Sequence, residues 1–180
     1  REKAQKRFDE YWAEHADDYS TKVSSSEHGL VDEQGAEYLF NKLLRIEDSS
    51  ITSLHVAEGT RIIGDKAFDY CDNLSELIIP EGVVSIGSEA FYRCSSLKSI
   101  TLPSTLREIG DDAFSFCENL SELIIPESVE SIGSNAFWGC SSLKSITLPS
   151  TLKEIGDEAF RSCDNLSEVI IPEGVVSIGS

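Results

Sequence analysis

The chain is poor in positive charge and has no long apolar run. It carries 15 Lys and Arg residues against 32 Asp and Glu residues, so its formal net charge is -17 at pH 7. Nucleic acids and anionic membranes are bound through Lys and Arg, so the composition argues against both as partners. No apolar stretch approaches the ~20 residues that a membrane-spanning helix needs, so we expect no membrane insertion.

The acidic residues are spread along the whole chain. There are 7 basic and 12 acidic residues before Ser49, and 8 basic and 20 acidic residues from Ser49 onward. This distribution suits a solvated acidic surface or, alternatively, a surface that meets a basic partner.

Catalytic and cofactor motifs are missing as well. The three histidines, His15, His28 and His55, share no ligand spacing with one another or with an acid. The chain has no Gly-rich phosphate loop after a strand, no G-x-S-x-G and no H-E-x-x-H. We therefore expect no enzymatic activity, no cofactor and no metal site.

What the chain does have is a repeat. Its five cysteines stand 23 residues apart, at Cys71, Cys94, Cys117, Cys140 and Cys163. Counted from Ser49, the chain contains five complete units and a sixth that stops at Ser180, before its Ala-Phe pair. Self-similarity at a period in the twenties is typical of a solenoid, in which each unit buries its apolar side against its neighbours.

Each unit follows the pattern L-x-x-I-x-I-P-x-x-V-x-x-I-G-x-x-A-F-x-x-C. In the second unit these positions are Leu74, Leu77, Ile79, Pro80, Val83, Ile86, Gly87, Ala90, Phe91 and Cys94. The pattern resembles the BspA-type leucine-rich repeats of bacterial surface proteins, and the resemblance covers residues 49–180. It implies an α/β leucine-rich-repeat solenoid, a right-handed and strand-rich superhelix with a parallel sheet on its concave face.

The segment before the proline alternates as a strand does. In the second unit Leu77 and Ile79 are expected to face the core, and Glu76 and Ile78 to face outward. The proline, which has no N–H, should end each strand at the same height. The later glycine should permit a tight turn, and the phenylalanines should stack as a core spine.

The cysteine column does not suit a disulfide or a zinc site. In-register neighbours would lie ~4.8 Å apart with parallel Cβ vectors, farther than the ~3.8 Å that a disulfide prefers, and their number is odd. No C-x-x-C pair supplies zinc ligands at short spacing. We expect free, buried thiols that fill the core.

The outward row of the sheet is the first candidate binding surface. Its residues alternate with a 46-residue period, which places an outward isoleucine on every second unit. Either β-branched residues simply suit a pleated surface, or a partner strand or helix lies along this face. The candidate partner-binding residues are Glu76, Ile78, Lys98, Thr101, Glu122, Ile124, Lys144, Thr147, Glu168 and Ile170.

A second candidate surface follows the Ala-Phe pair, where the units differ most. Exposed aromatic residues there would suit a binding hot spot, but packing between successive turns would explain them equally well. The residues are Tyr92, Phe116 and Trp138.

Residues 1–48 do not fit the repeat and are expected to form a helical cap and a linker. Phe8, Trp12 and Tyr19 fall on a helical stripe between Glu2 and Tyr19. Residues 21–26 are expected to be a linker, and residues 37–46 fit either a second short helix or an irregular first strand that would be a degenerate repeat. The cap would close the first unit or, alternatively, offer an independent docking helix.

The sixth unit lacks its final Ala-Phe-x-x-Cys segment, so we expect the natural protein to continue beyond Ser180. Its Leu166, Val169 and Ile171 would otherwise form an exposed edge. End-to-end association of two copies through this edge is therefore a further prediction.

Together these features predict a non-enzymatic protein-binding module. The resemblance implies a cell-surface or secreted adhesin, whose partner would be a protein such as a host extracellular-matrix or plasma protein. A structural spacer in a larger surface protein and an intracellular scaffold with reduced thiols stay open as alternatives.

Overall fold

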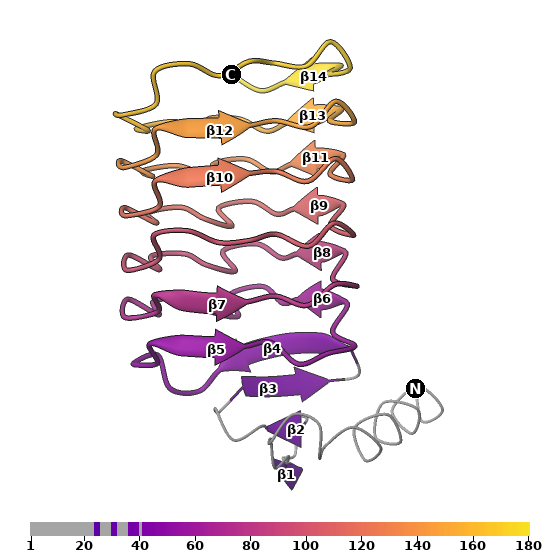
Figure 1. The fold of residues 1–180 in the computed structure, drawn as a ribbon, viewed down its shortest axis with the longest axis vertical. Helices are drawn as coiled ribbons and strands as arrows, with labels where there is room; N and C mark the ends of the chain where they lie inside the picture. The colour runs from indigo at the N-terminus through magenta and orange to yellow at the C-terminus, as the bar shows by residue number, and fades with distance from the viewer. Residues whose placement is uncertain (1–23, 26–29, 32–35, 40) are drawn as a thin grey trace.

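Strands and turns make up the part of the chain that the computed structural model describes. The described residues are 24–25, 30–31, 36–39 and 41–180. None of them is helical, and so none belongs to a helix that crosses a membrane. The repeats wind into a strand-rich solenoid of stacked turns, which Figure 1 shows with its long axis vertical. We call each 23-residue unit a rung, so that the first rung is 49–71 and the sixth is 164–180.

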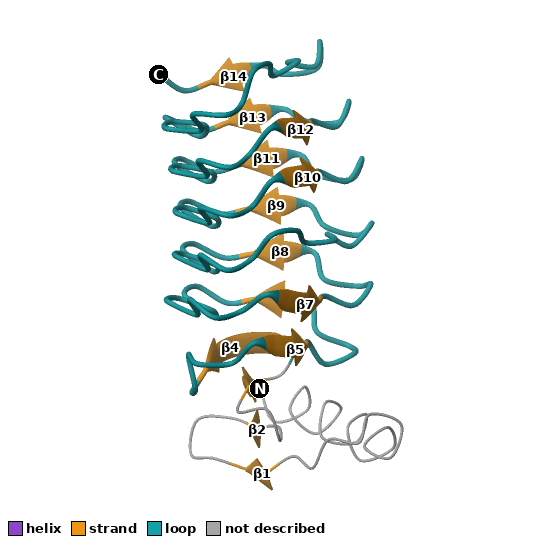
Figure 2. Ribbon diagram, turned by 60° about the vertical axis from the view of Figure 1, so that its left-hand side comes forward, coloured by secondary structure: helices purple, strands orange, loops and turns teal. Residues whose placement is uncertain are grey.

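One continuous sheet runs along the solenoid. Its ten strands follow the order β1-β2-β3-β4-β6-β8-β9-β11-β13-β14, and from β4 onward all neighbours are parallel (Figure 2). Each rung contributes one two-residue strand that ends immediately before its glycine. These strands are β6 (Ile62–Ile63), β8 (Ser85–Ile86), β9 (Glu108–Ile109), β11 (Ser131–Ile132), β13 (Glu154–Ile155) and β14 (Ser177–Ile178).

The segment that precedes the proline forms only two short sheets. They pair β5 (Ser53–His55) with β7 (Glu76–Ile78) and β10 (Glu122–Ile124) with β12 (Ser145–Thr147), both in parallel. Residues 99–101 and 168–170 are not strands. The parallel sheet predicted for this segment therefore forms only between the first and second rungs and between the fourth and fifth, rather than along the whole stack. The proline that follows this segment in every rung after the first has no N–H to donate, so the pairing ends there.

The predicted orientation of side chains is confirmed in the segment that precedes the proline, which we call the proline-linked segment. Leu77 and Ile79 are buried, while Glu76 and Ile78 are exposed. The leucine and isoleucine side chains of successive rungs meet inside the solenoid and form one continuous core. Burial of this apolar surface is the main favourable term in the free energy of folding.

A third ladder joins the rungs at the Ala-Phe turn. In the first rung the N–H groups of Lys66, Phe68 and Tyr70 donate to carbonyl oxygens of the second rung, over 2.8 to 2.9 Å. The residues between them donate instead to carbonyls three positions earlier in their own turn. The same alternation recurs in the following rungs, so backbone hydrogen bonds tie each rung to the next on this side too.

The predicted phenylalanine spine is confirmed. Successive rings are nearly parallel, with interplanar angles of 6 to 14° and centroid separations of 4.9 to 5.6 Å. This offset stacking suits aromatic pairs in a core. The rings belong to Phe68, Phe91, Phe114, Phe137 and Phe160.

The glycine that follows each strand of the long sheet has a different role from the one predicted. None of these glycines has a positive φ, so the turn does not require one. A Cβ on Gly110 would lie 2.7 Å from the carbonyl carbon of Gly87, and one on Gly156 would lie 2.3 Å from the nitrogen of Ser134. Glycine is needed because each rung packs its backbone directly on the rung before.

Two other positions of the rung carry the left-handed backbone. They are the second residue after the glycine and the residue before the cysteine, with φ between 52° and 60° wherever they are not glycine. Only Gly139 supplies a glycine at either position, with a φ of 72°. Left-handed residues other than glycine cost roughly 1 to 2 kcal/mol each, so the repeat holds strain that its inter-rung hydrogen bonds offset.

Two kinds of hydrogen bond from a serine to a carboxylate of the preceding rung alternate along the stack, and we call them the aspartate clasp and the glutamate clasp. From odd to even rungs, an aspartate after the glycine accepts the N–H of the next rung's serine, as Asp111 does from Ser134 over 2.7 Å. From even to odd rungs, a glutamate after the proline accepts both the N–H and the hydroxyl of a serine, as Glu127 does from Ser150 over 3.0 and 2.8 Å. The two rung types are therefore complementary partners.

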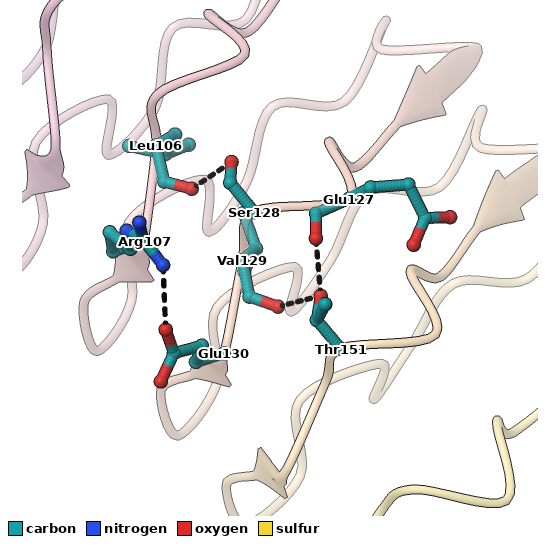
Figure 3. Close-up of polar contacts among 7 residues, drawn as sticks. All are labelled: Leu106, Arg107, Glu127, Ser128, Val129, Glu130 and Thr151. Carbon is teal, nitrogen blue, oxygen red and sulfur yellow. Dashed lines mark hydrogen bonds and ion pairs between the residues drawn. The ribbon is translucent and has the colours of Figure 1, made fainter.

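Further side-chain contacts between rungs lie beside the glutamate clasp, as Figure 3 shows. Hydroxyl groups approach carbonyl oxygens of a neighbouring rung, and one ion pair bridges two rungs. The contacts are Ser128 Oγ to Leu106 O at 2.5 Å, Thr151 Oγ1 to Glu127 O at 2.6 Å and to Val129 O at 2.9 Å, and Arg107 Nη1 to Glu130 Oε1 at 2.9 Å.

The described residues before the first rung form strands rather than a helix. β1 (Ser24–Ser25), β2 (Leu30–Val31), β3 (Ala36–Leu39) and β4 (Lys42–Ile46) are joined by antiparallel pairing. β4 then pairs in parallel with β6, as a rung would, so the strand interpretation of residues 37–46 holds. The linker expected at 21–26 includes β1, and the predicted helix from Glu2 to Tyr19 lies outside the described residues. The division of the chain after Asp48 stays a prediction.

The last rung has a neighbour on one side only. β14 is the final strand of the long sheet, and Ile171, Val176 and Ile178 are exposed at 42, 80 and 59%. Leu166 and Val169 are only partly buried. The edge predicted from the sequence is thus present, and end-to-end association through it stays a prediction.

Replacing Gly110 with alanine should destabilise the stack. The added Cβ would collide with backbone of the preceding rung, and overpacking of this kind costs roughly 1 to 3 kcal/mol in the free energy of unfolding. Urea unfolding followed by circular dichroism measures the loss. Ser88→Ala is the matched control, because it removes a side chain next to Gly87 and leaves the backbone bonds intact; its effect should stay within about 0.5 kcal/mol. Equal stability of G110A and the unaltered protein would contradict this role of the glycine.

Ser162→Gly should have the opposite effect. Ser162 has a φ of 57°, and glycine removes the steric cost of that conformation while adding backbone entropy to the unfolded chain. The net expectation is a gain of about 0.5 to 1 kcal/mol in the free energy of unfolding, again measured in urea. Ser142→Gly is the control, because Ser142 has no positive φ, and it should lower stability. A gain in S142G equal to that in S162G would show that relief of backbone strain does not cause the stabilisation.

Candidate functional site

The outer row of the proline-linked segment is exposed on even rungs. Ile78, Ile124 and Ile170 have 48, 73 and 74% of their surface accessible, and each lies two residues after a glutamate that is exposed as well. Adjacent Leu77 and Leu123 are buried. The period-2 alternation of the strand thus turns large apolar side chains to solvent at a regular interval of two rungs.

The odd rungs place polar residues between these isoleucines. The register pairs Glu122 with Ser145 and Ile124 with Thr147, so neighbouring rungs align residue by residue. Lys98, Thr101, Lys144 and Thr147 are all exposed. The face therefore alternates an apolar and acidic rung with a hydroxyl and basic rung. We call it the isoleucine face.

Four of the predicted residues meet around one hollow of this face. Lys144 and Thr147 of the fifth rung and Glu168 and Ile170 of the sixth line a pocket of about 490 Å³. Its apolar lining includes Ile146, Leu148 and Pro172. The lining also contains one cationic side chain, Lys144, and two carboxylates, Glu127 and Glu168, so the pocket can accept an apolar side chain of a partner and orient it by charge.

The second candidate surface is a ladder of aromatic rings on the Ala-Phe turns. Tyr92 lies 5.6 Å from Phe116, and Phe116 lies 5.0 Å from Trp138, measured between ring centroids. All three are half-buried, because each covers its neighbour. Packing between turns thus accounts for much of their surface, which was one of the two interpretations of the sequence.

Sequence reasoning missed three members of this ladder. Tyr70 extends it, 5.6 Å from Tyr92, and is 51% exposed. The Arg93 guanidinium carbon lies 5.4 to 5.7 Å from the centroids of Tyr70, Tyr92 and Phe116, and that of Arg161 lies 5.6 Å from Trp138. The signal was present in the sequence, since the aromatic residue alternates between the first and second positions after the phenylalanine.

The five cysteines are free and buried, and four of them are also hydrogen-bond donors. The Sγ atoms of Cys94, Cys117, Cys140 and Cys163 lie 3.1 to 3.2 Å from the carbonyl oxygen of the phenylalanine one rung earlier. The thiols therefore link adjacent rungs by hydrogen bonds as well as filling the core. Each of these carbonyls also accepts the backbone N–H of the cysteine in its own rung, so the thiol is its second donor.

Burial also changes the acidity of these thiols. Desolvation raises the pKa of Cys71 to about 12 and that of Cys163 to about 11, and it raises the pKa of Cys94, Cys117 and Cys140 far above the ordinary value. Since the thiolate is the nucleophile and the metal ligand, these cysteines are unreactive in the folded protein. Within residues 41–180, no three His, Cys, Asp or Glu side chains gather as metal ligands would.

Comparison with known proteins supports the repeat assignment. A family profile described as BspA type leucine rich repeat region matches residues 38–180 in six copies. No curated protein matches the chain significantly.

Several solved bacterial structures are similar. The T. pallidum leucine rich repeat protein TpLRR shares 30% identity over 88% of this chain and 83% of that chain, with a TM-score of 0.75. A leucine rich cell surface protein from Faecalibacterium prausnitzii A2-165 shares 29% identity over 87% of this chain but only 39% of its own, with a TM-score of 0.69. The pneumococcal vaccine antigen PcpA, at 23% identity over 88% of this chain and 42% of that chain with a TM-score of 0.62, shares the fold.

The raised thiol pKa values predict a loss of stability in alkali. The folded protein keeps thiol protons that the unfolded chain releases. The stability that these thiols contribute is therefore fully present below the unfolded pKa of about 8.5, and it is lost as the pH rises toward the folded pKa of Cys71, about 12. Each thiol that titrates only when unfolded adds a slope of about 1.4 kcal/mol per pH unit. Urea unfolding from pH 7 to 10.5 measures it, and Cys71→Ala should make the decline shallower. Parallel declines in C71A and the unaltered protein would contradict this linkage.

Proposed function

The chain belongs to the BspA-type leucine-rich repeat family, and from this membership we propose that it is a non-enzymatic protein-binding module whose isoleucine face grips a protein partner. The stacked rungs hold that face rigid, because every rung is tied to its neighbours by backbone hydrogen bonds. A rigid face loses little conformational entropy when a partner binds.

The observation that carries the proposal is the exposure of three large apolar side chains at one repeated position. Ile78, Ile124 and Ile170 are 48, 73 and 74% exposed. The second and fourth rungs, by contrast, bury almost all their other branched apolar side chains. The three side chains lie in line at one position of the rung, and exposed apolar surface rimmed by polar residues is a feature of interaction sites. The spacing of two rungs, ~9.6 Å, suits an extended or helical partner segment that lies along the solenoid axis.

The pocket beside Ile170 gives this face a point of selectivity. Lys144, Glu127 and Glu168 are among its lining residues, so a partner side chain that enters it meets one positive and two negative groups. Charges at the rim of an interface affect the association rate and the choice of partner more than the affinity. The aromatic ladder from Tyr70 to Trp138 is the second surface on which a partner would find exposed rings.

We further propose a cell-surface or secreted location and an adhesive role toward a host extracellular-matrix or plasma protein. The support is the similarity to the Faecalibacterium prausnitzii protein, which is described as a cell surface protein. The chain spans less than half the length of that protein, so its other segments belong to the proposal only by analogy.

A binding screen of immobilised matrix and plasma proteins, read by biolayer interferometry, tests the proposal. The variant I78E/I124E/I170E should bind at least about tenfold more weakly, because three desolvated anchors are replaced by charges. Its thermal stability should not change, since the three side chains are exposed. The matched control S85E/S131E/S177E adds the same charge to the same even rungs on the long sheet and should bind normally.

Equal weakening in both triple variants would show that added negative charge, rather than the isoleucine face, reduces binding. Complete absence of binding by the unaltered protein would favour the spacer interpretation, in which the stacked rungs only separate other domains.

A further inference from the structure

The outer face of the long sheet carries a groove that none of the candidate surfaces includes. It has a volume of about 460 Å³ and is lined by residues from the first to the sixth rung, between Asp65 and Ser177. It therefore runs along the solenoid axis. The isoleucine face belongs to the other strand of each rung, so the two surfaces are built from different residues.

The groove exists because the glycine column has no side chains. Gly87, Gly110, Gly133 and Gly156 are among its lining residues. On one side of the glycines lie the outward residues of the strands, and on the other side lie the residues that follow each glycine. The first wall contains Ser85, Glu108, Ser131, Glu154 and Ser177, and the second contains Asp65, Ser88, Asp111 and Ser134.

The charge of the groove has one sign. Four lining residues are carboxylates, Asp65, Glu108, Asp111 and Glu154, and none of the lining residues is Lys or Arg. Within residues 41–180, neither Glu108 nor Glu154 has an ion-pair partner, and the nearby cation Arg107 is engaged with Glu130. The aspartates use Oδ1 to accept an N–H of the next rung, as in the Asp65 to Ser88 bond of 3.0 Å.

The carboxylates recur with the two-rung period. In the third rung Glu108 and Asp111 flank the glycine and both line the groove; in the fifth rung Glu154 lines it, and Asp157 follows the glycine. The even rungs between them place serines at both positions. At ~4.8 Å per rung, the acidic pairs are ~9.6 Å apart along the groove.

We propose that this groove binds an extended basic segment of a partner protein that carries a cation at every third residue. A polyproline II segment has three residues per turn and a rise of ~3.1 Å per residue, so one face repeats every ~9.3 Å, close to the spacing of the acidic pairs. Serine hydroxyls between the pairs can bond to the solvated backbone of such a segment, and the side-chain-free floor lets that backbone approach. The inference goes beyond the isoleucine face and does not depend on it.

The probe is a fluorescein-labelled peptide of five Lys-Pro-Pro triplets, and the readout is fluorescence anisotropy at low ionic strength. E108Q/E154Q should weaken its binding by about tenfold, since each exposed ion pair contributes modestly. Ser131→Phe, which fills the groove without changing charge, should weaken it as well. E76Q/E122Q is the matched control: it removes the same two charges from the isoleucine face and should bind as the unaltered protein does. Thermal melts confirm that all variants are folded.

A second peptide of the same composition, with its five lysines in one block, separates spacing from charge. The spaced peptide should bind more tightly than the blocked one. Equal binding of the two peptides, equal losses in both double variants, or no binding of the spaced peptide would each overturn the inference.

Discussion

The constant register of the hydrogen bonds between rungs is the constraint on which the rest of the structure depends. Backbone N–H groups donate to carbonyl oxygens of an adjacent rung at three places: at the glycine, at the Ala-Phe turn and before the proline-linked segment. A buried N–H or carbonyl without a partner is costly, so a unit cannot gain or lose a residue without disturbing three sides at once. This register places Phe91 on Phe114 and the thiol of Cys117 on the carbonyl of Phe91.

The alternation of two rung types is a second level of organisation built on this register. The aspartate clasp joins odd to even rungs, and the glutamate clasp joins even to odd rungs, so each interface uses one clasp and the second to fifth rungs each offer one acceptor and one donor. Bonding to Ser104 lowers the pKa of Glu81, as expected for a carboxylate that accepts an N–H in its charged form. The same alternation sets the spacing on the isoleucine face and in the acidic groove. The clasps and both surfaces thus share one two-rung period.

Much of this architecture could be predicted from the sequence, because it depends on periodicity. The phenylalanine spine, the inward Leu77 and the outward Ile78 follow from repeat spacing and strand alternation alone. The long sheet could not be predicted in this way, because two residues such as Ser85 and Ile86 are too few to show an alternating pattern. The left-handed positions could not be predicted either, because Lys66 and Glu89 occupy them instead of the glycine or asparagine that usually marks that conformation. The pocket beside Ile170 depends on how adjacent rungs meet, which no single unit encodes.

The paired clasps also bear on how such an array grows at the level of the gene. Duplication or loss of a single unit would set two rungs of the same type against each other, which places carboxylates in register with carboxylates and serines in register with serines. Duplication or loss of two adjacent units keeps every interface intact. Selection for a well-bonded stack therefore favours recombination in steps of two units, and the length of the array among descendants of one ancestral gene is expected to change by even numbers of rungs.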